Sequence, residues 1–173
     1  MHSHRRVVKK PSDLDELWRE QLRTSRPLIS SKPSSVGFRI ITKCLAGCVM
    51  CGYTNAGKIL SLDQFKRAAE ELLPTAKQVL LIGGEVLQHP DFYEICECAY
   101  QYGVDVHITT NLYKLNGRRA KAIEGFLSVV KVSADGASKR TYESIRTHLS
   151  FDRLVDNLQT LAEIRNRNPK LQL

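Results

Sequence analysis

The chain lacks any long apolar segment. No apolar run among its 173 residues approaches the roughly 18 to 20 residues that a membrane-spanning helix needs. The basic N-terminal sequence MHSHRRVVKK is not followed by an apolar stretch, so it is not a secretory signal. We therefore expect a cytoplasmic protein with no membrane partner, about one average domain in length.

Cysteine is scarce and its count is odd. The chain has five cysteines, and Cys44, Cys48 and Cys51 fall within eight residues in the segment KCLAGCVMCGY. Three thiols crowded so closely cannot sensibly pair with one another, and an odd total argues against a disulfide framework. We interpret the three as reduced thiols that bind a metal centre.

Aromatic residues do not accompany the basic ones. The formal net charge is +8, but the basic residues are scattered over the N-terminal arm, Arg118 and Arg119, and Arg165 and Arg167. A stacking platform for nucleic acid would need aromatic side chains between them. The pattern favours a solvated basic surface and makes nucleic acid an unlikely ligand. An acidic partner or RNA is the alternative.

The sequence does contain a regular alternation of strand-like and helix-like segments. Short branched or apolar runs predict strands at 36–42, 79–82, 105–110 and 129–133. Helical spacing of apolar residues predicts helices at 61–73, 90–102, 117–126, 138–146 and 151–167. This alternation predicts crossover units, a parallel sheet and therefore an α/β fold.

The two ends of the chain differ from this pattern. Residues 1–35 predict a polar arm, a short helix at 12–23 and a linker rich in Ser and Pro, whereas 36–173 predict one core domain. The last residues, KLQL at 170–173, read as the opening of a fifth strand. Because a parallel sheet cut there would leave an open edge, we expect the N-terminal part of a longer protein whose later strands are absent.

Polar residues cluster directly after each predicted strand. The cysteine segment follows the first strand, and the later clusters are GGE at 83–85, TTN at 109–111 and SADG at 133–136. The carboxyl ends of parallel strands share one rim, where active sites form. The four clusters therefore predict a single site.

Three thiolates in one loop suit zinc or an iron-sulfur cluster. Structural zinc normally takes four ligands, and a second cysteine pair is missing because Cys96 and Cys98 point in different directions on a predicted helix. Three cysteines can hold three corners of a four-iron cluster, which leaves one iron open to a substrate or cofactor. The alternative is a non-catalytic zinc or iron-sulfur module, with zinc closed by His89 or His107.

The C-x3-C-x2-C spacing and the GGE segment together resemble the radical S-adenosylmethionine (radical SAM) enzymes. The segment GGEVLQHPDFYEI is similar to the Gly-Gly-Glu-Pro segment of that family and its following helix. The segment VSADGASKRTYESIR resembles the Ser-x-Asp-Gly segment of peptide-modifying members that carry a C-terminal SPASM-type iron-sulfur extension. The resemblance runs from about residue 35 to the end and implies a partial (β/α)6 TIM-like barrel, truncated near the fifth strand.

The resemblance also implies cofactors and a reaction. Cys44, Cys48 and Cys51 would hold a [4Fe-4S] cluster, and SAM would chelate the fourth iron. An electron from a donor such as a flavodoxin or ferredoxin would break SAM into methionine and a 5'-deoxyadenosyl radical that takes hydrogen from a substrate. The substrate would be a peptide or protein, with small-molecule chemistry as the alternative. We expect the isolated chain to bind the cluster with weak or no turnover.

The same resemblance implies contacts with SAM from residues at the rim, namely Met50, Gly83, Gly84, Glu85, Asn111, Ser133 and Asp135. Gly83 and Gly84 would let the backbone approach the amino group of SAM, because no Cβ is in the way. Glu85 would either accept a hydrogen bond from that ammonium or shape the turn.

The remaining expected contacts have alternatives of their own. Ser133 and Asp135 are candidates for the ribose hydroxyls, although Asp-Gly is also an ordinary turn pair. Asn111 would face the same cavity or close a turn. Met50 stands where the family often has an aromatic residue near the adenine. Among the departures from the family pattern, Leu45 replaces a frequent Asn, and this leaves the subfamily and the substrate open.

Overall fold

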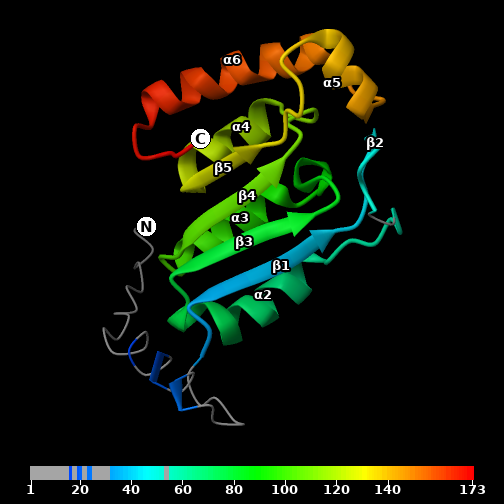
Figure 1. Cartoon of the computed structure of the whole chain (residues 1–173). Coiled ribbons are helices and arrows are strands. Elements are labelled where there is room, and N and C mark those ends of the chain that lie inside the picture. The colour runs from blue at the N-terminus through cyan, green and yellow to red at the C-terminus, as the bar shows by residue number, and fades with distance from the viewer. Residues whose placement is uncertain (1–15, 17–18, 21–22, 25–31, 53–54) are drawn as a thin grey trace.

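The computed structural model describes residues 16, 19–20, 23–24, 32–52 and 55–173 (Figure 1). The helix expected at 12–23 lies largely outside these described residues. Among the helices that are described, none combines the length and apolar character that a bilayer crossing requires.

Four parallel strands form the centre of the molecule. They are β1 (Ser35–Ile41), β3 (Gln78–Gly83), β4 (Asp105–Thr110) and β5 (Val129–Val132), in the spatial order β1-β3-β4-β5. Every pairing among them is parallel. The predicted sheet is confirmed, and the carboxyl ends of all four strands share one edge.

Helices cover one face of this sheet. In Figure 1, α2 (Leu62–Leu72), α3 (Phe92–Gln101) and α4 (Gly117–Phe126) lie behind the strands. The long helix α6 (Phe151–Arg167) lies beyond β5 and packs against α4, and α5 (Lys139–Ile145) precedes it. Short 3-10 helices follow α2 and β3, η1 (Leu73–Thr75) and η2 (Val86–Gln88).

Local sequence sets the starts of the helices. Ser61 caps α2, where it forms a capping box with Gln64. Asn116 accepts a hydrogen bond from the Arg119 N–H at the start of α4, and Ser150 does the same for Arg153 in α6. Such side-chain acceptors satisfy N–H groups that the first turn of a helix leaves without a partner.

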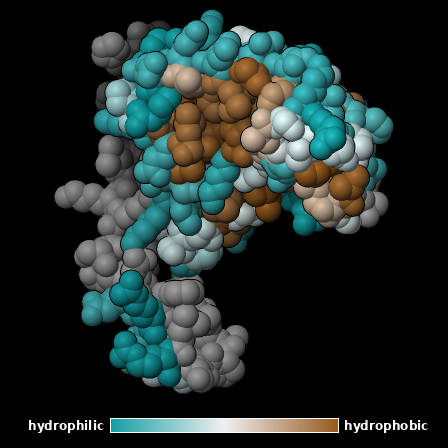
Figure 2. Space-filling view, turned by 45° about the horizontal axis from the view of Figure 1, so that its top comes forward, coloured by the Kyte–Doolittle hydropathy of each residue, from teal (hydrophilic) through white to brown (hydrophobic). Residues whose placement is uncertain are grey.

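The two faces of the sheet differ in character. Alternate residues such as Phe38, Leu81 and Ile108 are buried beneath the helices. The side chains on the opposite face, such as Arg39 and Lys131, are exposed. Figure 2 shows an apolar patch bordered by hydrophilic side chains on one face of the molecule. Exposed apolar patches of this kind are typical of interaction surfaces.

The end of the chain joins the sheet beside β5. Val129 and Gln172 form a parallel bridge. The Val130 N–H donates to the Gln172 carbonyl at 2.9 Å, and the Gln172 N–H donates to the Ser128 carbonyl at 2.9 Å. The fifth strand expected at 170–173 therefore begins as a bridge in parallel register with β5.

Candidate functional site

The cysteine loop, which carries Cys44, Cys48 and Cys51, follows the carboxyl end of β1 and is hydrogen-bonded to a distant part of the chain. Within it, β2 (Gly47–Cys48) pairs antiparallel with β6 (Arg146–Thr147), which directly follows α5. The Val49 N–H adds a bond of 3.0 Å to the Ile145 carbonyl. A Cβ at Gly47 would lie 2.7 Å from the Thr147 Oγ1, so any larger residue there would force the Thr147 side chain to shift.

Side-chain N–H donors approach two of the three thiols. The Nδ2 of Asn111 lies 3.9 Å from the Cys44 Sγ, and the Nη1 of Arg146 lies 3.6 Å from the Cys48 Sγ. Burial raises the pKa of the Cys44 thiol, and charges on Glu85, Cys48 and Cys51 raise it further. Among the described residues, no three His, Cys, Asp or Glu side chains lie close enough to share one metal ion.

Glu85 joins β3, η2 and β4 at the centre of the site. Its side chain is 1 % exposed. Its Oε1 accepts from the Thr110 hydroxyl at 2.5 Å and from the Leu87 N–H at 3.0 Å, and its Oε2 accepts from the Asn111 N–H at 2.7 Å. Burial raises the pKa of Glu85, and these hydrogen bonds act against that rise. The turn-shaping role expected as one alternative is thus present in the geometry.

Gly83 and Gly84 bring the end of β3 against the cysteine loop. The Gly84 N–H donates to the Ile41 carbonyl and the Glu85 N–H donates to the Lys43 carbonyl, both at 2.9 Å. A Cβ on Gly83 would overlap the Ile41 carbonyl oxygen, and one on Gly84 would overlap that of Lys43. These glycines are therefore required by the packing of two loops. A contact with SAM through them stays a prediction.

Asn111 closes a turn, as one of its two expected roles requires, and its place in a SAM cavity stays a prediction. Its Oδ1 accepts from the Tyr113 N–H at 3.0 Å, which closes a turn, while its Nδ2 is directed at Cys44. Ser133, at the end of β5, donates its N–H to the Thr110 carbonyl at 2.9 Å. The structure thus brings Asn111 and Ser133 to the same rim as the cysteines.

Asp135 forms an ion pair with Arg146, a residue to which no sequence motif pointed. The Nε of Arg146 donates to the Asp135 Oδ2 at 2.5 Å, and the Arg146 side chain is 13 % exposed. Arg146 ends the segment VSADGASKRTYESIR, but its approach to Cys48 depends on the β2–β6 pairing, for which two residues carry no local signal. The position of this guanidinium could therefore not be found from spacing alone.

Met50 and Cys51 lie on the outer side of the cysteine loop. Cys51 is exposed, and the Met50 side chain is 56 % exposed. The Cys51 N–H donates to the Cys48 carbonyl at 3.0 Å, which closes the turn between these two cysteines. The expected place of Met50 near an adenine stays a prediction.

His89 does not serve the zinc alternative. The residue is buried, its Nε2 lies 2.9 Å from the Leu60 carbonyl, and its Nδ1 accepts from the Asp91 N–H at 3.0 Å. Both ring nitrogens are therefore in use, with the proton on Nε2. Burial lowers the pKa of His89, which favours this neutral ring.

Comparison with known proteins gives matches over most of the chain. A family model described as the radical SAM superfamily matches residues 38–169. The mycofactocin maturase MftC of Mycobacterium tuberculosis is 32 % identical over 138 residues, which are 75 % of this chain and 34 % of that protein. The AdoMet-dependent heme synthase of Methanosarcina barkeri is 24 % identical over 142 residues, 78 % of this chain and 41 % of that protein. The chain thus spans less than half the length of these relatives.

Solved structures share the fold. The Streptococcus suis protein SuiB, bound to the precursor peptide SuiA, superposes with a TM-score of 0.72 at 12 % identity, covering 87 % of this chain and 34 % of SuiB. Methylornithine synthase (PylB) gives a TM-score of 0.60 at 18 % identity, covering 92 % of this chain and 51 % of that one. The expected partial (β/α)6 TIM-like barrel is confirmed.

Proposed function

The chain belongs to the radical SAM superfamily, and we propose that it is the cluster- and SAM-binding part of an enzyme that begins radical chemistry. Proteins of this family bind a [4Fe-4S] cluster and SAM, and SuiB has been solved with S-adenosylmethionine bound. The proposed core domain is 36–173, after an N-terminal arm at 1–35. Cys44, Cys48 and Cys51 would hold the cluster in this chain.

The proposal depends chiefly on the surroundings of the thiols. Asn111 and Arg146 each direct an N–H group at a cysteine sulfur, at 3.9 and 3.6 Å. N–H groups and positive charge near ligating sulfurs stabilise their negative charge and tune the reduction potential of a cluster. An all-thiol donor set also fits iron and sulfur in its chemistry.

The residues around the thiols would divide the work. When bound, the cluster and SAM would supply a carbon-centred radical that removes a hydrogen atom from the substrate. Asp135 holds Arg146 beside Cys48. Glu85 fixes the backbone of Asn111 and so orients its amide at Cys44. Because Asp135 and Glu85 are committed to these contacts, we propose positioning roles for both.

The remaining rim residues would meet SAM. We propose that Ser133 contacts the ribose hydroxyls, that Met50 lies near the adenine and that the backbone at Gly83 and Gly84 approaches the amino group. Ser133 is only partly buried at the end of β5, and Met50 is exposed. Each is therefore accessible to a ligand on the rim.

We further propose a peptide or protein substrate and an electron donor of the flavodoxin or ferredoxin class. The relative MftC is named a maturase, and SuiB was solved with a precursor peptide. The heme synthase relative, and a relative from Methanothermobacter thermautotrophicus named "Probable GTP 3',8-cyclase", point instead to small molecules. The likeness of the SADG segment to peptide-modifying members favours the peptide.

Anaerobic reconstitution with iron and sulfide tests the proposed cluster. We expect about four iron and four acid-labile sulfide per chain, and an EPR signal after reduction that SAM perturbs. Cys48→Ala should lose this cluster, whereas Cys98→Ala, a cysteine on α3 remote from the loop, should retain it. A Cys48→Ala variant that kept the same cluster would contradict the proposed cluster site. One zinc per chain with no acid-labile sulfide would contradict it as well.

A further inference from the structure

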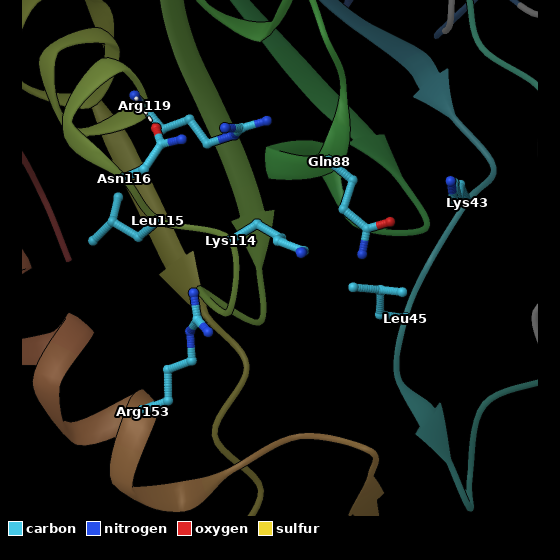
Figure 3. A pocket seen from close by; sticks show the side chains of 8 residues that line it. All are labelled: Lys43, Leu45, Gln88, Lys114, Leu115, Asn116, Arg119 and Arg153. Atoms are coloured by element: carbon cyan, nitrogen blue, oxygen red, sulfur yellow. Dashed lines mark hydrogen bonds between the residues drawn. The ribbon is translucent and has the colours of Figure 1, made fainter.

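A cation-lined cavity lies next to the cysteine loop. It has a volume of about 500 Å³ and is lined by Lys43 and Leu45, the two neighbours of Cys44, and by residues that follow β3 and β4. Figure 3 shows Gln88 extending into it from η2 and Lys114 from the loop after β4, with Arg153 reaching toward it from α6. The cavity therefore adjoins the rim that carries the proposed cluster site.

The charged side chains that line this cavity are all cations. Lys43, Lys114, Arg119 and Arg153 contribute four cations from three parts of the chain, and no Asp or Glu is among the lining residues. Lys114 and Arg119 are partly buried, so they flank a hollow rather than project from a convex surface. Like charges gathered in this way repel one another unless an anion lies between them.

Two of the four cavity cations, Arg119 and Arg153, lie in the first turn of a helix, which is the unfavourable end for a positive charge. The N-terminus of a helix carries a partial positive charge, so Asp or Glu is stabilising there and Arg is not. Helix α4 has no acidic residue in its first turn and carries Arg118 and Arg119 instead. Arg118 pairs with Glu94, but Arg119 faces the cavity and donates its Nε to the Leu87 carbonyl.

Helix α6 has a similar arrangement. Arg153 is in the first turn, where Ser150 caps its backbone N–H at 3.3 Å, and its guanidinium lies 4.5 Å from the centre of the Tyr113 ring. The acidic residue of that turn, Asp152, pairs with Lys139 at 2.5 Å and does not line the cavity. The cavity is thus lined by one arginine from the first turn of α4 and one from the first turn of α6, side chains that suit a bound anion.

We propose that this cavity is a binding site for a compact polyanion, a ligand that carries a pyrophosphate or triphosphate group. Four cations match the charge of such a group. A volume near 500 Å³ lies within the range of small-ligand pockets. Arginine and lysine together are the side chains that proteins use for phosphate oxygens. The proposal does not require the iron-sulfur cluster, so its failure would leave the proposed function untouched.

Calorimetric titration of the chain without reconstitution, at physiological salt, tests this site. We expect tripolyphosphate and pyrophosphate to bind with one site per chain, and inorganic phosphate to bind at least tenfold more weakly. Lys114→Gln and Arg153→Gln should each weaken tripolyphosphate binding about tenfold, because each removes a charge-assisted contact. Lys121→Gln removes the same charge from an exposed position on α4 and should change the affinity less than twofold.

The control separates the cavity from the general charge of the chain. An equal loss of affinity in Lys121→Gln would mean nonspecific attraction to a chain of net charge +8 and would overturn the proposal. The absence of binding at millimolar tripolyphosphate would also overturn the proposal. A parallel titration with an acidic flavodoxin would overturn it if the flavodoxin bound through the same residues and tripolyphosphate did not. A nucleoside triphosphate that binds as tightly as tripolyphosphate would support the site. Tighter binding would also support it and would add recognition of the base. Circular dichroism of each variant checks that the fold is intact.

Discussion

The buried carboxylate of Glu85 concentrates several roles in one side chain. It accepts hydrogen bonds from the backbone of η2, from the Thr110 hydroxyl and from the backbone of Asn111. The amide of Asn111 in turn points at Cys44. One acidic side chain therefore links the end of β3, the end of β4 and the first cysteine.

At the residue scale, Glu85→Gln tests whether these hydrogen bonds to the carboxylate stabilise the fold. A glutamine can place its oxygen toward Thr110 and Leu87, but its NH2 group then faces the Asn111 N–H, and two donors meet in a buried place. We expect a loss of about 2 to 3 kcal/mol in the free energy of unfolding, measured by urea titration. Glu70→Gln, at an exposed position on α2, is the matched control and should change stability by less than about 0.5 kcal/mol. Equal stability of Glu85→Gln and the natural chain would show that the carboxylate is not needed for folding.

At the same scale, single residues differ in how far the sequence could place them. The three cysteines were found because thiols at close spacing have few structural explanations. Arg146 was not found, since its contact with Cys48 spans 98 positions and arises from a pairing of two-residue strands. Glu85 was found at the rim, but its hydrogen bonds to Thr110, Leu87 and Asn111 became visible only in the structure, and its expected contact with SAM stays a prediction.

At the scale of elements, the two glycines after β3 determine how closely that strand approaches the cysteine loop. The backbone of Gly84 and Glu85 bonds to the carbonyls of Ile41 and Lys43 at 2.9 Å. Gly83 has a φ of +150°, in the region that favours glycine. In this segment the backbones of two loops of the site therefore lie in direct contact, with no side chain between them.

Gly84→Ala tests this contact. The added Cβ would overlap the Lys43 carbonyl and lie 3.2 Å from the Cys44 Cβ, so the cysteine loop must shift. We expect a loss of about 2 kcal/mol in the free energy of unfolding, as for overpacked positions, and less iron bound on reconstitution. Gly125→Ala is the matched control, because a Cβ there meets nothing within 4 Å and an alanine in a helix stabilises by about 0.5 to 1 kcal/mol. If Gly84→Ala were as stable as this control, the close approach of Gly84 to the Lys43 carbonyl would not contribute to the free energy of unfolding.

Regular elements were predictable where one local pattern dominates. The strand expected at 105–110 and the helices expected at 117–126 and 151–167 have the observed bounds, because apolar spacing and capping agree there. The pair β2–β6 and the 3-10 helix η2 were not predicted. The β2–β6 pair depends on a contact between segments about 100 positions apart, and η2 depends on the side chain of Glu85, the residue that caps its start.

At the scale of the whole molecule, the last residues bind the far edge of the sheet. Leu171 is fully buried, whereas Leu173, two positions later, is 59 % exposed. The bridge between Val129 and Gln172 continues the parallel order of the sheet beyond β5. These contacts join segments more than 40 positions apart, which is the pattern expected of a strand that follows its crossover helix.

Leu171→Ala should therefore destabilise the molecule as a whole. Removing a buried leucine side chain costs both its transfer free energy and the cavity left behind, about 3 kcal/mol, and the loss should appear as one cooperative shift in urea unfolding. Leu173→Ala removes the same atoms from an exposed position, and we expect a change below about 0.5 kcal/mol. Two variants of equal stability would mean that the final segment does not contribute to the sheet in solution. A loss confined to Leu171→Ala would show that the bridge beside β5 is part of the folded core, with the parallel sheet extending past its fourth strand.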